Sequence, residues 1–321
     1  MHGFRLAIDG FSRVGADLRR PECVLTTAHG ELYVSDERGG VTRIAPDGST
    51  RLYVGTTPDG QPLAANGFAM LADGSFLIAP LAGGGVFRLH RNGQAEIFLQ
   101  EVDGRTLACP NFVLLDHQER IWICCMTQQD RRTITSYSRD RRDGYLVLVD
   151  KRGARIVAEH VGYPNEVRID PTGRYLYTNE TLAARLLRYP IHADGSLGAA
   201  ETVIAFDGFT LDSAGGAWIT ALVPNRLWHV GVDGEARLLI EDAHPDQLAR
   251  LTALQKTSGV PKSLIYEERG ATLRNISSVA FGGPDLKQVF LGSLMGEQIL
   301  SFHAPVAGMQ PAHWNFGPFD T

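Results

Sequence analysis

Short apolar runs with alternating polar residues follow one another along the whole chain, and tight-turn sequences separate them. DG, NG and GG steps recur between these runs, among 35 glycines and 16 prolines in 321 residues. Alternation with a period of two predicts strands, and the turn residues between the runs predict hairpins. The pattern therefore predicts an all-β protein.

One pattern of about 13 residues occurs five times. Each copy opens with an oxygen-bearing side chain, continues as an alternating strand, turns at a loop rich in Gly, Asp or charge, and resumes as a strand. The openers are Glu22, Asn66, Asn111, Asn165 and Asp207, and a weaker sixth copy opens at Ser277. They lie 44, 45, 54, 42 and 70 residues apart. Spacings of about 40 to 50 residues, with hairpins in each unit, indicate the blades of a β-propeller.

The expected fold is a six-bladed β-propeller that occupies residues 1–321 as a single domain. Residues 1–20 are expected to close the ring of blades by pairing with the C-terminal segment. Between blades five and six, residues of about 241–275 break the repeat: Pro245 stands at a helix start, and leucines follow it at helical spacing. This helix-containing insertion either covers a sheet edge or forms a lid over the channel mouth.

In a propeller the equivalent strand of every blade lines the central channel, so the six openers are expected to form a ring round one axis. The ring carries two carboxylates, three carboxamides and one hydroxyl, and none of its positions is Lys or Arg. A single Asn or Asp before a strand is more often a turn residue. The register that all six positions share favours instead a hard divalent cation, with Ca²⁺ as the best fit and Zn²⁺, Mg²⁺ and Mn²⁺ as alternatives.

Composition excludes several classes of function. The net charge of −5 and the pI near 6.1 give no basic surface for nucleic acid. No run of about eighteen apolar residues predicts a membrane span, and the N-terminus lacks a secretion signal, which favours the cytoplasm. The four cysteines include no CxxC motif, and we expect them to be reduced thiols in the core. We expect a monomer or homodimer whose partner is a small-molecule substrate.

Four segments resemble the blade-opening motifs of the regucalcin (senescence marker protein) and gluconolactonase family of six-bladed propeller hydrolases. They are "RPEC", "CPNFVLLDHQERIWI", "YPNEVRIDPTGRYLYTNET" and "FDGFTLDSAGGAWIT". Squid-type diisopropyl fluorophosphatase is similar in the same motifs. The resemblance, over about residues 15–305, implies that Glu22, Asn165 and Asp207 bind a divalent metal, with Asn111 as a fourth ligand. It also implies that Asp207 acts in hydrolysis, as general base or as nucleophile.

Two positions depart from the family's pattern. Cys109 stands where sugar-lactone members carry an arginine, and Phe112 stands where the fluorophosphatase carries an aspartate. Both changes favour a less polar, bulkier or aromatic lactone over a sugar. Asn66 and Ser277 share the ring and are expected, with Cys109 and Phe112, to contact the substrate.

The predicted function is hydrolysis of a lactone to its hydroxy acid. The cation would act as Lewis acid and Asp207 as general base. A phosphotriesterase-like hydrolase and a non-catalytic propeller that binds calcium or a ligand remain as alternatives. The segment Gln129–Gly144 carries five arginines. It is either a solvated loop or a cover over the channel mouth that holds a substrate carboxylate.

Overall fold

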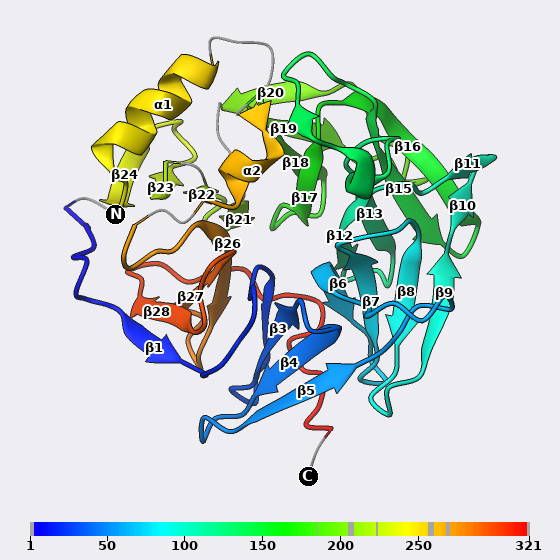
Figure 1. Ribbon diagram of the computed structural model, residues 1–321, viewed down its shortest axis with the longest axis horizontal. Coiled ribbons are helices and arrows are strands. Elements are labelled where there is room, and N and C mark those ends of the chain that lie inside the picture. The colour runs from blue at the N-terminus through cyan, green and yellow to red at the C-terminus, as the bar shows by residue number, and fades with distance from the viewer. Residues whose placement is uncertain are drawn as a thin grey trace.

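Six four-stranded antiparallel sheets surround a central axis (Figure 1). The computed structural model describes residues 3–183, 185–204, 209–222, 224–255, 260–267 and 270–319. The first three blades are β2 (Val24–Thr26), β3 (Leu32–Asp36), β4 (Gly40–Ile44) and β5 (Thr50–Val54); β6 (Ala65–Met70), β7 (Phe76–Pro80), β8 (Val86–Leu89) and β9 (Ala95–Leu99); and β12 (Pro110–Leu115), β13 (Ile121–Cys125), β15 (Gly144–Asp150) and β16 (Gly153–Val161).

The other three blades follow the same order from the axis outward. They are β17 (Pro164–Ile169), β18 (Tyr175–Glu180), β19 (Arg185–Pro190) and β20 (Glu201–Ile204); β21 (Phe209–Leu211), β22 (Ala217–Ala221), β23 (Arg226–Val230) and β24 (Ala236–Glu241); and β26 (Ile276–Gly282), β27 (Gln288–Ser293), β28 (Ile299–His303) and β1 (Ser12–Val14). The predicted six-bladed propeller is therefore confirmed.

The two ends of the chain share the last blade. Strand β1 pairs antiparallel with β28, with Ser12 opposite Ser301 and Val14 opposite Ile299. The outermost strand of blade six thus comes from the N-terminus, and the ring is closed by backbone hydrogen bonds as the sequence predicted.

Short elements outside the blades lie mainly around the insertion. Helix α1 (Pro245–Gln255) begins at the predicted proline and lies at the rim beside β24 (Figure 1), and α2 (Lys262–Ile265) lies nearer the axis. The remaining elements are the 3₁₀ helix η1 (Arg131–Thr133), the paired strands β10 (Glu101–Val102) and β11 (Arg105–Thr106), and the paired strands β14 (Ser136–Tyr137) and β25 (Val260–Pro261). No helix in the described part of the chain has the length and apolar character needed to cross a bilayer.

Five of the six blades bury a large side chain at the eleventh position after the opener. These residues, all fully buried, are Tyr33, Leu77, Trp122, Leu176 and Trp218. In blade three, Asp116 fixes both the turn and the tryptophan: its Oδ1 accepts from two backbone N–H groups, and its Oδ2 accepts from Nε1 of Trp122 at 2.8 Å. A buried carboxylate is tolerated here because several donors satisfy it.

Blade five repeats this arrangement with Asp212. Its Oδ1 accepts from the N–H of Gly216 at 2.8 Å, and its Oδ2 lies 3.2 Å from Nε1 of Trp218 and 3.0 Å from Nε2 of His229. Burial alone would raise the pKa of Asp212, but His229 and the N–H donors outweigh it and hold the pKa below its usual value. Asp212 is therefore a structural turn residue.

Candidate active site

The ring positions coincide with breaks in the strand register. Asn111 lies between Pro110, opposite Cys125, and Phe112, opposite Cys124, so the inner strand has one residue more than its partner. The same extra residue occurs near Asn66, Asn165 and Ser277 in blades two, four and six. Such a bulge re-aims a side chain at the point where regular pairing is interrupted. Ring side chains are thus turned toward the axis by the backbone.

Three carboxamides form a hydrogen-bonded chain across adjacent blades. Nδ2 of Asn66 donates to the backbone O and to Oδ1 of Asn111, at 3.0 and 3.1 Å. Nδ2 of Asn111 donates in turn to the backbone O of Asn165 at 3.0 Å and to its Oδ1. This chain brings the predicted ring residues of blades two, three and four into direct contact.

Glu22 and Ser277 join the ring from blades one and six. Oγ of Ser277 donates to the backbone carbonyl of Glu22 at 3.2 Å, and Oγ of Ser278 donates to the same oxygen. The sixth position, Asp207, lies outside the described residues. Five of the six predicted positions are therefore described, and they lie together.

Two arginines from outside the repeat reach this ring. Nη1 of Arg20 lies 2.5 Å from Oε2 of Glu22 and donates to Oδ1 of Asn66 at 3.3 Å. Arg131, whose side chain is only 7% exposed, donates from Nη1 to the same Asn66 oxygen at 3.2 Å and from Nη2 to Oδ1 of Asn111. No ring position is itself cationic, yet two guanidinium groups share the site, which the repeat did not predict.

A cover formed by two separate segments holds Arg131 in place. We use "the cover" for residues 130–137 and 260–265. Asp130 caps η1 by accepting from the N–H of Arg132, β14 pairs with β25, and Nζ of Lys262 donates to the backbone O of Arg131 at 2.8 Å. Residues 130–137 of the arginine-rich loop are folded as part of the cover, whereas the binding of a substrate carboxylate by this loop stays a prediction. The five arginines were the available sequence signal, but they did not single out Arg131.

The predicted substrate contacts separate into two groups. Cys109 lies at the ring, where its Sγ accepts from Nε of Arg131 at 3.4 Å. Phe112 instead lines a cavity of about 540 Å³ farther along the channel, with the guanidinium of Arg168 4.5 Å above its ring. The ring and this cavity are therefore two different places, and Phe112 belongs to the second.

The ring has the chemistry of a site for a hard cation. Among the described residues, no three His, Cys, Asp or Glu side chains lie together in a way that could hold a metal ion. The predicted ligands, however, include carboxamides and Asp207, and Asp207 lies outside the described residues. Oε2 of Glu22 is buried and, despite its short contact with Arg20, has no partner there in hydrogen-bond geometry. Carboxylate and carboxamide oxygens turned to one axis fit a divalent cation. Because the guanidinium groups use some of the same oxygens, cation binding requires them to release those atoms.

Comparisons with known proteins agree with this fold. No curated protein sequence matches the chain. The chain is similar in structure to a calcium-binding regucalcin from Agrobacterium tumefaciens (TM-score 0.66, 17% identity, covering 96% of this chain and 98% of that one). It is also similar to a gluconolactonase from Xanthomonas campestris (0.63, 17%, 90% and 88%) and to a luciferin-regenerating enzyme (0.59, 14%, 97% and 98%). The model of the SMP-30/Gluconolactonase/LRE-like region matches residues 20–243, and the chain belongs to this family.

Proposed function

We propose that this protein is a metal-dependent lactonase that hydrolyses a lactone to its hydroxy acid at the ring. The observation that carries the proposal is the convergence of Glu22, Asn111 and Asn165, at or just before the starts of the inner strands, in a chain of this family. A family whose name includes gluconolactonase supports the reaction class, and the printed name of the regucalcin relative supports calcium.

The residues of the ring would have two roles, binding of the cation and proton transfer. Glu22, Asn111, Asn165 and Asp207 would hold the divalent cation through oxygen atoms. When bound, the cation would supply Lewis-acid polarisation of the lactone carbonyl. Asp207 would accept the proton of the attacking water and then donate it to the alkoxide that forms when the lactone opens.

The surroundings of the ring favour a lactone less polar than an aldonolactone. Cys109 offers only a thiol to the substrate, and the cover carries an apolar cluster of Ile134 and Tyr137 packed against Tyr163, which precedes Pro164 at the start of β17. The two tyrosine rings pack edge to face, 5.4 Å apart. Arg131 adds one donor group to this wall, so a substrate with one acceptor on an otherwise apolar body fits best.

The proposal is tested by assaying purified protein, with its metal content measured, against sugar, aliphatic and aromatic lactones. We expect turnover to be highest with an aliphatic or aromatic lactone and to be abolished by Asp207→Asn in a variant with an unchanged circular dichroism spectrum. Asp246→Asn, on the exposed start of α1, is the matched control and keeps full activity.

Other outcomes of the same panel would replace the proposal. A higher kcat/KM for organophosphates than for every lactone would make the protein a phosphotriesterase. Metal binding without turnover of any substrate would make it a binding propeller. Full activity of Asp207→Asn would remove Asp207 from the mechanism.

A further inference from the structure

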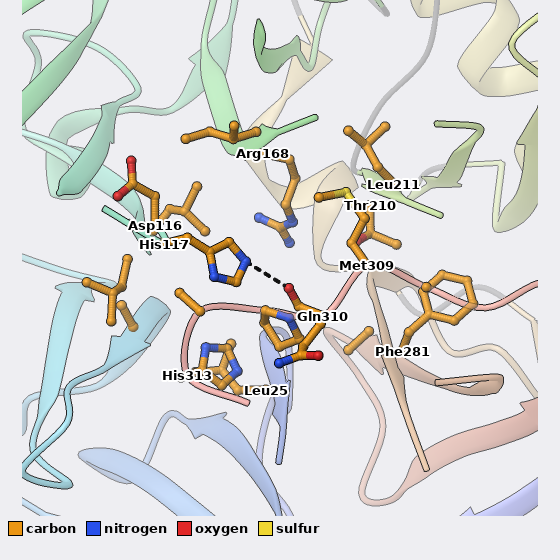
Figure 2. Close-up of a pocket in the computed structure, with 18 of the residues that line it drawn as sticks. Leu25, Asp116, His117, Arg168, Thr210, Leu211, Phe281, Met309, Gln310 and His313 are labelled. Atoms are coloured by element: carbon orange, nitrogen blue, oxygen red, sulfur yellow. Dashed lines mark hydrogen bonds between the residues drawn. The ribbon is translucent and has the colours of Figure 1, made fainter. Parts of the chain in front are cut away.

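The segments at the two ends of the channel are held by different kinds of contact. At the cavity end, Gly308–His313 lines the cavity, and its backbone is tied to blade three, where Nε2 of His117 lies 3.0 Å from the carbonyl O of Gln310 (Figure 2). At the other end, the cover reaches the ring through the side chain of Arg131. The contact of the cover with the ring therefore uses the same oxygen atoms that a cation would need.

Two carboxamide oxygens of the ring have their full number of hydrogen bonds. A carboxamide oxygen has two lone pairs and accepts two hydrogen bonds. Oδ1 of Asn111 accepts from Nδ2 of Asn66 at 3.1 Å and from Nη2 of Arg131. Oδ1 of Asn66 accepts from Nη1 of Arg131 at 3.2 Å and from Nη1 of Arg20 at 3.3 Å. Asn111, a predicted metal ligand, can therefore bind a cation through Oδ1 only after one of its two donors has left.

The charges at the ring show which donor leaves. Among the described residues, the guanidinium groups of Arg20 and Arg131 and the carboxylate of Glu22 share the site, which gives an excess of positive charge. A divalent cation at the same oxygens would be repelled by both guanidinium groups. Asn66 lies within the inner strand β6 and Arg20 lies just before β2, whereas Arg131 belongs to the cover. Arg131 is therefore the donor that can move away.

Arg131 depends on the ring as much as the ring depends on Arg131. The hydrogen bonds described for its guanidinium go to Cys109, Asn66 and Asn111. A buried guanidinium that loses such acceptors is costly, so its release favours movement of the cover that carries it. The cover also contacts the blades through Tyr137, whose ring packs on that of Tyr163, and this single ring contact adds little stabilisation.

We propose that Arg131 and the divalent cation compete for the ring, so that binding of the cation releases Arg131 and loosens the cover. The coupling is reciprocal: a closed cover weakens cation binding by the same factor by which the bound cation weakens closure. The released guanidinium then becomes available to donate to a substrate. This inference rests on the metal binding that forms part of the proposed function.

Calorimetric titration of the full chain with Ca²⁺, after dialysis against a chelator, tests the competition. Arg131→Met should bind Ca²⁺ about tenfold more tightly than the wild type, because no charge-assisted hydrogen bond has to be broken first. Arg132→Met removes the same charge from the exposed neighbour, which pairs with Asp130, and should bind Ca²⁺ as the wild type does. Equal affinities of the wild type and Arg131→Met would overturn the inference and leave the metal site in place.

Hydrogen exchange measured by mass spectrometry tests the release of the cover. Two amides of the cover are hydrogen-bonded within it: the N–H of Thr133 donates to the carbonyl of Asp130, and the N–H of Lys262 donates to that of Thr135, both at 2.9 Å. In the wild type, Ca²⁺ should speed exchange in peptides from the cover. In Arg131→Met, the same peptides should exchange rapidly with or without Ca²⁺.

The exchange measurement on the wild type needs no variant, so it decides the inference even if Arg131→Met does not fold. If Ca²⁺ binds but leaves exchange in the cover unchanged, or slows it, the inference is wrong, because the charge of Arg131 then acts only through space. If neither protein binds Ca²⁺, Zn²⁺, Mg²⁺ or Mn²⁺, the ring is not a metal site, and the proposed function is wrong together with this inference.

Discussion

The two ends of the channel are built by the same six inner strands and have opposite chemistry. At the ring, bulges near the starts of the strands turn Asn66, Asn111 and Asn165 to the axis, and two guanidinium groups join them. Past the bulges regular alternation resumes, and the same strands present mainly apolar side chains to the cavity. One extra residue in a strand therefore separates a polar site from an apolar one.

The two ends also differ in how they treat buried polar groups. At the cavity end, Asp116 and Asp212 are satisfied by backbone and tryptophan N–H groups within their own turns. At the ring, the three carboxamides meet across blades, through contacts between residues far apart in the chain. A polar group satisfied within one turn stabilises a blade, whereas groups gathered from several blades form a site that can bind something else.

The largest expected effect is on catalytic activity, and it distinguishes the ring from the cavity end of the channel. Glu22→Gln should lower kcat/KM of the lactonase reaction by about 10³-fold, because the ring loses the negative charge that holds the cation, and the cation stabilises the developing oxyanion. It should also lower the bound metal measured by elemental analysis. Glu37→Gln, an exposed carboxylate in the same blade, is the matched control and should change neither. An active, metal-replete Glu22→Gln variant would show that the ring is not the catalytic end.

Removal of the guanidinium from the cover should have a smaller effect. Arg131→Met is expected to raise KM about tenfold through loss of one charge-assisted hydrogen bond to the substrate, with kcat changed less. Arg132→Met, at the exposed neighbour paired with Asp130, should leave both parameters unchanged. If the two variants behaved alike, Arg131 would serve only the packing of the cover.

The smallest expected effect concerns stability at the cavity end. Because the folded-state pKa of Asp212 lies below its unfolded value, the folded protein binds fewer protons there, and this contribution is present above about pH 4. It should be lost as pH falls through the folded-state pKa. Asp212→Asn should cost about 1 kcal/mol of unfolding free energy at pH 7.

Urea unfolding at pH 7 and at lower pH measures this difference between wild type and variant. The difference in unfolding free energy between wild type and Asp212→Asn should become smaller as the pH is lowered. A gap that stays constant with pH would mean that the charge of Asp212 contributes nothing and that only its turn geometry matters.

Much of the fold followed from residues close together in the chain. The spacing of the openers predicted six blades, and Pro245 with its leucines predicted α1. The ring was predictable as a set, because a repeat places equivalent positions round one axis, and five of its six members are found together. Asp207 and the roles of the ring residues in metal binding and catalysis stay predictions.

The features of the site that could not be predicted from the sequence depend on contacts between residues outside the repeated pattern. Arg20 precedes its opener, and Arg131 lies in η1, 65 residues from Asn66, to which it donates a hydrogen bond. Phe112 follows Asn111 directly, yet it faces the other end of the channel because of the bulge at Asn111. Local pattern cannot predict where a loop folds or on which side of a bulge a neighbour falls.

By itself, the sequence determined the number of blades and the register of the ring, since hairpins and periodic burial depend on residues that are neighbours in the chain. Only the tertiary structure decided that Arg20 and Arg131 enter the ring, that the cover pairs β14 with β25, and that the segment Gly308–His313 lines the cavity. These features depend on the packing of distant segments, where burial and charge balance over the whole channel select the partners.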